Sequence, residues 1–394
     1  MIAGVAKESF EGERRVALVP SSVPALKKAG IDVLVEKGAG QAAGYSDKEY
    51  EEKGAQLADG REAVFSGSDA VLQVRGLGAN RDAGRSDLEL MRAGQLIIGM
   101  HDPLGSPESV AELAGRGVAA FSLELMPRIS RAQSMDALSS MATIAGYKAA
   151  LMAAVELHRM FPMLMTAAGT VTPSKVFVVG AGVAGLQAIA TAHRLGASVR
   201  GYDLRPAVKE QVESVGATFV ELDLDTGDSE SEGGYAKEMD EAFLEKQREM
   251  MKKEVAKSDV VITTALVPGK KAPLLITRDM VSGMRAGSVI VDLAAEQGGN
   301  CEATDPGETV DEGGVKVMGP LNIPSTVAYH ASMMYSNNIT KFVQHLASDG
   351  NIDPGGLADD EIGKETLLTR DGKVVNERVA ALLSDKDGNK GGES

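Results

Sequence analysis

Three glycines and an aspartate in this sequence have the types and spacing of a dinucleotide site. In KVFVVGAGVAGLQAIATA (175–192), a β-branched run leads into Gly180, Gly182 and Gly185, and an alanine-rich segment follows. The first glycine allows a tight turn, the second lets the backbone approach a pyrophosphate, and the third lets a helix pack on its strand. Asp203 follows about twenty residues later, where a carboxylate can accept hydrogen bonds from ribose hydroxyls. The pattern predicts that the chain binds a dinucleotide.

The end of the second strand bears on which dinucleotide binds. The carboxylate of Asp203 should repel a 2′-phosphate, which favours NAD(H) over NADP(H). Arg205 points the other way, because a nearby arginine is able to accommodate that phosphate.

A second stretch, MPRISRAQSMDALSSMA (126–142), mixes helix formers with two arginines, a glutamine, an aspartate and four serines. Its spacing alone predicts an amphipathic helix with a polar face in water.

The elements that must position these groups are short β-branched runs that alternate with longer helical stretches, as in parallel sheets. We predict a first set of strands at residues 2–8, 32–38, 70–76, 95–101 and 118–124. A second set is predicted at residues 175–182, 197–204, 217–223, 259–266, 288–294 and 314–320. Two sets indicate an α/β protein with two doubly wound, Rossmann-like domains with parallel sheets, separated by a cleft.

The predicted N-terminal domain is discontinuous, with residues 1–136 joined by about 330–380, because the helical stretch after Pro324 has no sheet of its own to complete. The dinucleotide domain is predicted at 137–329, including a linking helix. The acidic segment 223–243 is either an idle surface loop or a mobile flap. The polar, glycine-rich end, 385–394, is predicted to be a disordered tail.

Composition excludes several classes. The chain has 394 residues, 43% of them hydrophobic and 25% charged, as in soluble globular proteins. The net charge of −15 argues against a nucleic-acid partner. One cysteine and five histidines without metal-binding spacing predict no metal site. The most apolar stretch, 149–171, is interrupted by charged residues and a proline, so no membrane span is expected.

With these motifs placed, the chain resembles the soluble NAD(H)-binding alpha subunit (domain I) of proton-translocating NAD(P) transhydrogenases, from Met1 to about residue 350. Alanine dehydrogenases share a similar fold and several of the motifs; the RISRAQSMD segment discriminates between the two. The resemblance rests on KESFEGERRVALVP, ELMPRISRAQSMDALSS, MTAAGTVTPSKVFVVGAGVAGLQAIATA, GGYAKEM, TTALVPGKKAP and DLAAEQGGN.

The resemblance implies a loop and helix start that line a nicotinamide pocket, with the ring contacted by Arg128, Gln133, Asp136 and Ser139 and with Ile129 and Ser130 beside them. It implies that GGYAKEM is a mobile loop that closes over the nucleotide. Further NAD(H) contacts are implied at Val183, Asp203, Leu204, Arg205, Gly234, Tyr235, Gln247, Thr264, Ala265, Leu266 and Asn322.

The implied activity is Si/Re-specific hydride transfer from NADH on this chain to NADP⁺ on a partner subunit, with Gln133 reaching across. Membrane-spanning subunits would carry the coupled proton channel. The resemblance also implies a homodimer in a split-subunit arrangement. It places the chain in the cytoplasm, peripheral to the inner membrane through its partners.

Two other interpretations remain. An alanine dehydrogenase would use Arg15 to bind a carboxylate and His101 as an acid or base. However, that family's catalytic lysine segment reads LQVRGLG here, with Gln73 and Arg75, and arginine is a poor substitute because it hardly deprotonates. A regulatory module that senses NAD(H) without chemistry would show a degraded nicotinamide segment, whereas RISRAQSMDALSS looks intact.

Overall fold

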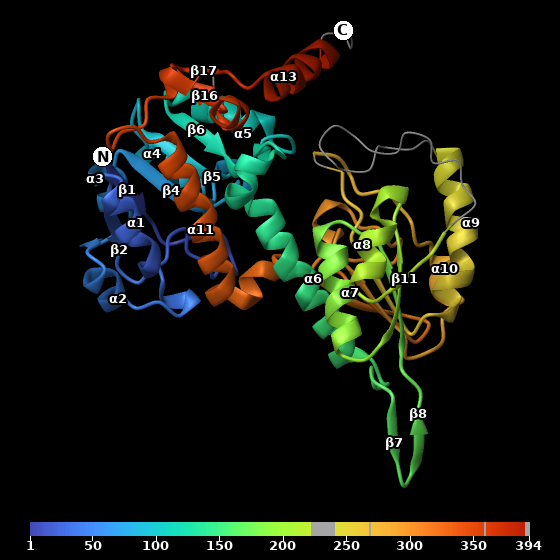
Figure 1. Ribbon diagram of the computed structural model, residues 1–394. Coiled ribbons are helices and arrows are strands. Elements are labelled where there is room, and N and C mark those ends of the chain that lie inside the picture. The colour runs from blue at the N-terminus through green and yellow to red at the C-terminus, as the bar shows by residue number, and fades with distance from the viewer. Residues whose placement is uncertain (222–240, 268, 358–359, 391–394) are drawn as a thin grey trace. The chain divides into compact units, whose positions relative to one another are not determined.

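The structure is a computed structural model that describes residues 1–221, 241–267, 269–357 and 360–390. The chain divides into two compact units, each with its own sheet (Figure 1). Unit 1 consists of residues 1–141 and 324–394, and unit 2 of residues 142–323.

Unit 1 contains a six-stranded parallel sheet in the order β3-β2-β1-β4-β5-β6. Its strands are β1 (Ile2–Val5), β2 (Asp32–Glu36), β3 (Gln56–Ala58), β4 (Ala70–Arg75), β5 (Leu96–Met100) and β6 (Ala119–Ser122). The order reverses between β1 and β4, as in a doubly wound fold.

Short helices connect these strands, and the last part of the chain returns to the same unit. They are α1 (Val23–Lys28), α2 (Asp47–Glu52), α3 (Arg61–Gly67), α4 (Arg85–Leu90), α5 (Pro107–Gly115), α11 (Ala328–Leu346), α12 (Glu361–Thr366) and α13 (Glu377–Lys390). Helix α11 is tied to the N-terminal segment because Ser332 Oγ and Ser336 Oγ accept hydrogen bonds from the amides of Val16 and Val19, both at 3.0 Å. A hairpin of β16 (Thr369–Arg370) and β17 (Lys373–Val374) lies between α12 and α13.

Unit 2 contains a seven-stranded sheet in the order β11-β10-β9-β12-β13-β15-β14, in which only β14 runs antiparallel. Its strands are β9 (Lys175–Val179), β10 (Ser198–Tyr202), β11 (Thr218–Phe219), β12 (Val260–Thr263), β13 (Val289–Asp292), β14 (Thr309–Glu312) and β15 (Val315–Met318). The helices are α7 (Val183–Arg194), α8 (Lys209–Ser214), α9 (Glu241–Lys257) and α10 (Arg278–Ser282). The chain enters the unit through α6 (Ala137–Glu156).

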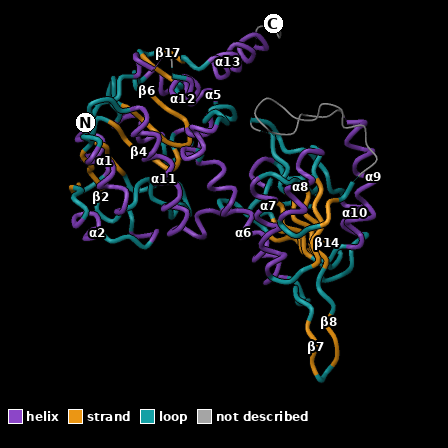
Figure 2. The backbone as a smooth tube through the Cα atoms, viewed as in Figure 1, coloured by secondary structure: helices purple, strands orange, loops and turns teal. Residues whose placement is uncertain are grey.

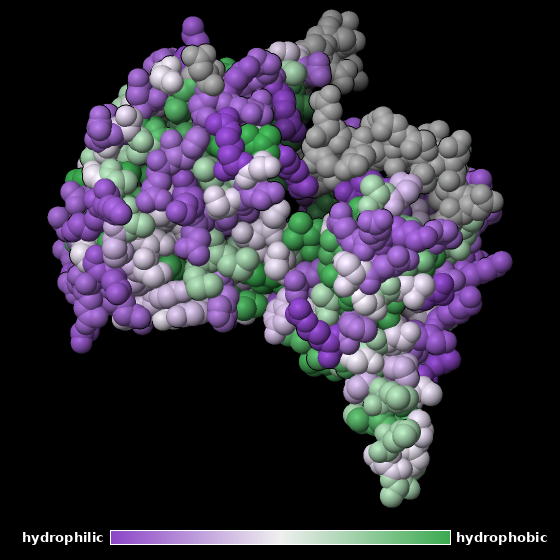
Figure 3. Space-filling model, in the orientation of Figure 1, coloured by the Kyte–Doolittle hydropathy of each residue, from purple (hydrophilic) through white to green (hydrophobic). Residues whose placement is uncertain are grey.

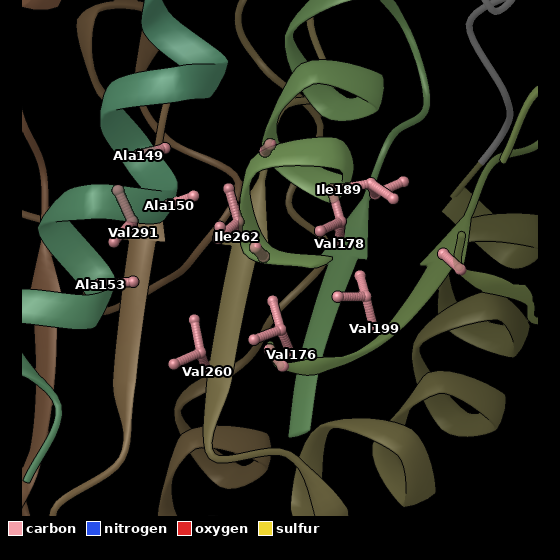
Figure 4. Close-up of a cluster of buried hydrophobic side chains, with 14 of the residues drawn as sticks. Ala149, Ala150, Ala153, Val176, Val178, Ile189, Val199, Val260, Ile262 and Val291 are labelled. Atoms are coloured by element: carbon pink, nitrogen blue, oxygen red, sulfur yellow. The ribbon is translucent and has the colours of Figure 1, made fainter. Parts of the chain in front are cut away.

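Alternate side chains of the buried strands in unit 2 build two cores. Val176, Val178 and Ile262 pack with residues of α6, α7 and α8 (Figure 4). Phe177 and Val261 point to the opposite face and pack with α9 and α10. Burial on both faces explains why these strands read as continuous apolar runs.

Helix α6 is the one helix among the described residues that is long and apolar enough to cross a membrane, with a mean hydropathy of 1.3 over its window. Ala149, Ala150 and Ala153 on this helix are fully buried against the sheet of unit 2 (Figure 4). The apolar character of α6 is therefore accounted for by packing inside a domain.

The predicted fold class is confirmed, since both units contain doubly wound parallel sheets. The prediction omitted β3 and β14, which are edge strands with few buried side chains and thus lack an apolar run. It also omitted the hairpin of β7 (Leu164–Thr166) and β8 (Gly169–Val171), which extends away from the sheet (Figure 2). Helix α13 continues to Lys390, so a helix extends into the predicted tail; its early residues, ERVAALL, are good helix formers.

Candidate functional site

The glycine-rich turn after β9 has one position that the protein's own packing does not require to be glycine. Gly180 has φ of +94°, and a Cβ there would lie 2.5 Å from Thr264 Oγ1. A Cβ on Gly185 would lie 1.8 Å from the Gly180 carbonyl oxygen. At Gly182, by contrast, a Cβ would meet no atom of the described residues within 4 Å. The space over Gly182 is therefore open, as a ligand that approaches the backbone needs.

Helix α7 begins at this turn and presents the start of its backbone to the same space. Gly182 is its N-cap, with no side-chain cap among the described residues, and Val183 opens the first turn. The first N–H groups of a helix lack intrahelical partners and carry a partial positive charge, so they favour an anion such as a pyrophosphate.

The turn lies where the strand order reverses, between the carboxyl ends of β9 and β12. Thr264 Oγ1 joins the two strand ends by donating to the Gly180 carbonyl at 3.1 Å. Ligands of open α/β sheets bind in the crevice at such a reversal.

Asp203 follows β10 and holds the turn. Its Oδ2 accepts the amide N–H of Ala181 at 2.7 Å, which ties the end of β10 to the glycine-rich turn. The guanidinium of Arg205 donates to both carboxylate oxygens, each at 2.9 Å, and the Arg205 amide donates to Oδ1 at 2.9 Å. The carboxylate predicted to receive a ribose is thus already paired with the arginine that we considered as its competitor.

The loop after β12 contains the predicted contacts Thr264, Ala265 and Leu266, all partly exposed. Asn300 fixes this loop, because its Oδ1 accepts the Ala265 amide at 3.0 Å and its Nδ2 donates to the Ala265 carbonyl at 2.9 Å.

Asp292, at the end of β13, holds Asn300 in turn and is completely buried. Its carboxylate accepts the amides of Asn300 at 2.8 Å and Cys301 at 3.0 Å, and the hydroxyl of Thr263 at 2.9 Å. Sequence reasoning assigned no role to Asp292 or Asn300. The available signal was an aspartate that closes an apolar strand in DLAAEQGGN, where an unpaired carboxylate would be costly.

The RISRAQSMD segment is not one amphipathic α-helix. Residues Ser130–Met135 form a 3-10 helix, η5, and α6 starts only at Ala137. Arg128, Ser130 and Gln133 are exposed and Ile129 is partly exposed. The segment is therefore a short turn of helix with polar side chains at its surface.

Asp136 and Ser139 have a clear local role. Asp136 caps the start of α6, since its Oδ1 accepts the Ser139 amide at 2.9 Å and its Oδ2 accepts the Ser139 hydroxyl at 2.5 Å. A nicotinamide contact by either residue stays a prediction.

The remaining predicted contacts are scattered. Gln247 is buried on α9 and donates to the Tyr202 hydroxyl at 2.9 Å, so it supports the end of β10 rather than lining a surface. Asn322 has φ of +46°, and its amide donates to Glu296 at 2.5 Å. Gly234 and Tyr235 lie outside the described residues.

Unit 1 also has polar groups where its strand order reverses, and these pair with one another. Glu13 Oε1 and Oε2 accept hydrogen bonds from Arg15 at 2.8 and 2.6 Å, and Arg75 Nε lies 3.2 Å from Oε2. Burial raises the pKa of Glu13, but the hydrogen bond and charge of Arg15 outweigh burial and lower the pKa to about 2. The carboxylate of Glu13 thus occupies both guanidinium groups that a substrate carboxylate would need.

His101 is fully buried, and neither of its ring nitrogens has a hydrogen-bond partner among the described residues. Burial lowers the pKa of the imidazole to about 4. The ring is therefore neutral near pH 7 and poorly placed to exchange protons with a substrate in solution.

Comparison with known proteins agrees with the resemblance seen in the sequence. The alanine dehydrogenase/PNT N-terminal domain matches residues 4–145, and the C-terminal domain of the same family matches residues 149–377. The first of the NAD(P) transhydrogenase alpha-subunit proteins of Rhodospirillum rubrum is 45% identical over 378 residues, which cover 95% of this chain and 98% of that protein.

Solved structures point the same way. The crystal structure of transhydrogenase from Sinorhizobium meliloti is 44% identical with a TM-score of 0.84, covering 95% of this chain and 100% of that one. Alanine dehydrogenase of Mycolicibacterium smegmatis is 30% identical over 392 residues, covering 97% of each chain. The chain is thus more similar in sequence to these transhydrogenase proteins than to this alanine dehydrogenase.

Proposed function

This chain belongs to the alanine dehydrogenase/PNT family, and we propose that it is the NAD(H)-binding subunit of a proton-translocating NAD(P) transhydrogenase. The observation that carries NAD(H) binding is the open space over Gly182, at the start of an uncapped helix. Similarity over nearly the whole chain to a transhydrogenase alpha subunit supports the choice of reaction.

The residues present fit a dinucleotide. Gly182 and Val183 would receive the pyrophosphate at the start of α7, and Asp203 would accept the adenosine ribose. The loop of Thr264–Leu266, fixed by Asn300, would form a further wall. We assign the dihydronicotinamide to Arg128, Gln133, Asp136 and Ser139.

Bound NADH supplies a hydride from C4 of its ring, and transfer to NADP⁺ on a partner subunit needs no acid or base from this chain. The chain's own part is to align the ring and to exclude water. Gln133, with its exposed amide, is our candidate for the side chain that reaches the partner's nucleotide. We propose Si/Re stereospecificity, coupled to proton translocation by membrane-spanning subunits to which this chain is peripheral.

The cluster in unit 1 disfavours alanine dehydrogenase. Arg15 and Arg75 are paired with Glu13, and His101 is buried and neutral, so the groups that would bind and protonate a 2-oxo acid are engaged or inaccessible.

The function is tested by mixing the purified chain with NADH and a separately expressed NADP(H)-binding partner domain, and following reduction of an NADP⁺ analogue. We expect turnover only when the partner is present. Oxidation of NADH by pyruvate and ammonia with the chain alone would instead identify an alanine dehydrogenase. NADH binding without turnover, even with the partner supplied, would favour a sensing module.

We also propose a homodimer, supported by the hairpin of β7 and β8. An isolated two-stranded hairpin is marginally stable in water, and this one exposes Met163, Met165 and Val171 at 60%, 74% and 39%. Figure 3 shows apolar surface along this hairpin. Such a surface calls for a covering partner, and we assign a second copy of the chain.

Met165→Asp is expected to weaken dimerisation, because a carboxylate in an apolar contact would lose hydration without gaining a partner. Sedimentation velocity at micromolar concentration should show the monomer in this variant and the dimer in the wild type. The matched control, Met333→Asp, changes a partly exposed methionine on α11 and should leave the dimer intact. A Met165→Asp protein that stays dimeric would contradict the role of the hairpin.

A further inference from the structure

The ion pair of Asp203 and Arg205 is more enclosed and more completely bonded than a ribose-binding carboxylate requires. The two side chains are only 6% and 13% exposed. Each carboxylate oxygen accepts two donors: Oδ1 takes the Arg205 amide and Nε, and Oδ2 takes the Ala181 amide and Arg205 Nη2.

An ionised carboxylate offers about four lone-pair positions, so these four donors use its accepting capacity. A ribose hydroxyl must therefore take over part of the position that the guanidinium holds. It follows that Arg205 lies immediately beside the place where the 2′-oxygen of the ribose would bind.

An arginine next to that oxygen is the group that recognises a 2′-phosphate, whereas an aspartate there recognises the free hydroxyl. The site contains both groups, and the geometry shows how they are ranked. While Asp203 is charged, the guanidinium already has a buried counter-ion, and a phosphate would have to displace it. If Asp203 lost its charge, a mostly buried cation would be left without that counter-ion, which is costly.

We propose that Arg205 is a latent 2′-phosphate-binding group that Asp203 holds out of use. The inference rests on the proposed binding of NAD(H) at this turn and names its specificity device. The preference for NAD(H) then comes from the pairing of Arg205 with Asp203 in addition to repulsion by the carboxylate.

The test measures NADH and NADPH binding to the full chain by nucleotide fluorescence, in phosphate-free buffer so that inorganic phosphate does not occupy the cation. Asp203→Asn keeps an oxygen that can accept the Ala181 amide but removes the charge. We expect its Kd for NADPH to fall roughly tenfold and its Kd for NADH to rise by a similar factor, as for the gain and loss of a charged hydrogen bond.

Asp203→Asn with Arg205→Ala should lose the gain in NADPH affinity. The matched control combines Asp203→Asn with Arg200→Ala, which removes an arginine of β10 paired with Glu254 instead, and should keep the gain. If Asp203→Asn does not fold, Asp203→Ser provides the same comparison, since its hydroxyl can still accept the Ala181 amide.

An unchanged or weaker NADPH affinity in the charge-neutral variant overturns the inference, as does a gain that survives Arg205→Ala. Wild-type protein that binds neither nucleotide would overturn the proposed function as well. Wild-type protein that binds NADH but transfers no hydride with the partner would overturn the proposed reaction alone, because this test measures only binding.

Discussion

Gly182→Val is expected to abolish detectable NADH binding while the protein stays folded. The backbone at Gly182 has φ of −72° and ψ of −169°, an extended conformation open to valine, and the added Cβ would meet no described atom within 4 Å. The new methyl groups would fill the space that we assign to the pyrophosphate. A loss of about 3 kcal/mol, or roughly a hundredfold in Kd, is a minimum for removing this contact.

Titration of NADH fluorescence measures the loss, and thermal unfolding shows whether the fold is retained. Gly115→Val is the matched control, because a Cβ at the end of α5 also meets no described atom within 4 Å; it should leave NADH binding unchanged. Gly185→Val should instead destabilise the protein, since its Cβ would lie 1.8 Å from the Gly180 carbonyl oxygen. A folded Gly182→Val protein with wild-type affinity would place the pyrophosphate elsewhere.

Gln133→Ala should lower partner-dependent hydride transfer by about 100-fold or more, because small misplacements of reacting groups can cost that much. NADH affinity should change little, since the glycine turn and Asp203 are untouched. The exposed Gln133 side chain lies on η5, so its removal leaves no cavity in the core.

Single-turnover measurements with the NADP(H)-binding partner separate hydride transfer from nucleotide binding. The adjacent Ser134→Ala is the control, because this side chain is exposed too and no nucleotide contact is assigned to it. Equal transfer rates in the wild type and Gln133→Ala would remove Gln133 from the reaction. Asp136→Ala would be less informative, because it also removes the N-cap of α6.

Much of the fold was predictable because buried parallel strands must be apolar on both faces. Val176–Val179 and Val260–Ile262 each serve two cores, so they read as continuous apolar runs. β14 escaped prediction because an exposed edge strand such as TVDE has no such constraint. Motif matching predicted the family, which the comparisons confirm.

The site was predictable only to a limited extent. The turn glycines could be found because two of them answer to local geometry, φ at Gly180 and helix packing at Gly185. Gln247 could not be placed in this way: its burial against Tyr202 depends on how α9 packs. Asp292 and Asn300 were missed because their partners lie on other strands and loops.

By itself the sequence determined the doubly wound α/β architecture, the family and the glycine turn, because these depend on periodicity and on residues close together in the chain. Only the tertiary structure decided which charges are paired: Asp203 with Arg205, and Glu13 with Arg15 and Arg75. The same residue types at the same positions could have been left for a ligand. Pairing is a matter of distances of about 3 Å between side chains, and such distances are set only when strands and helices pack.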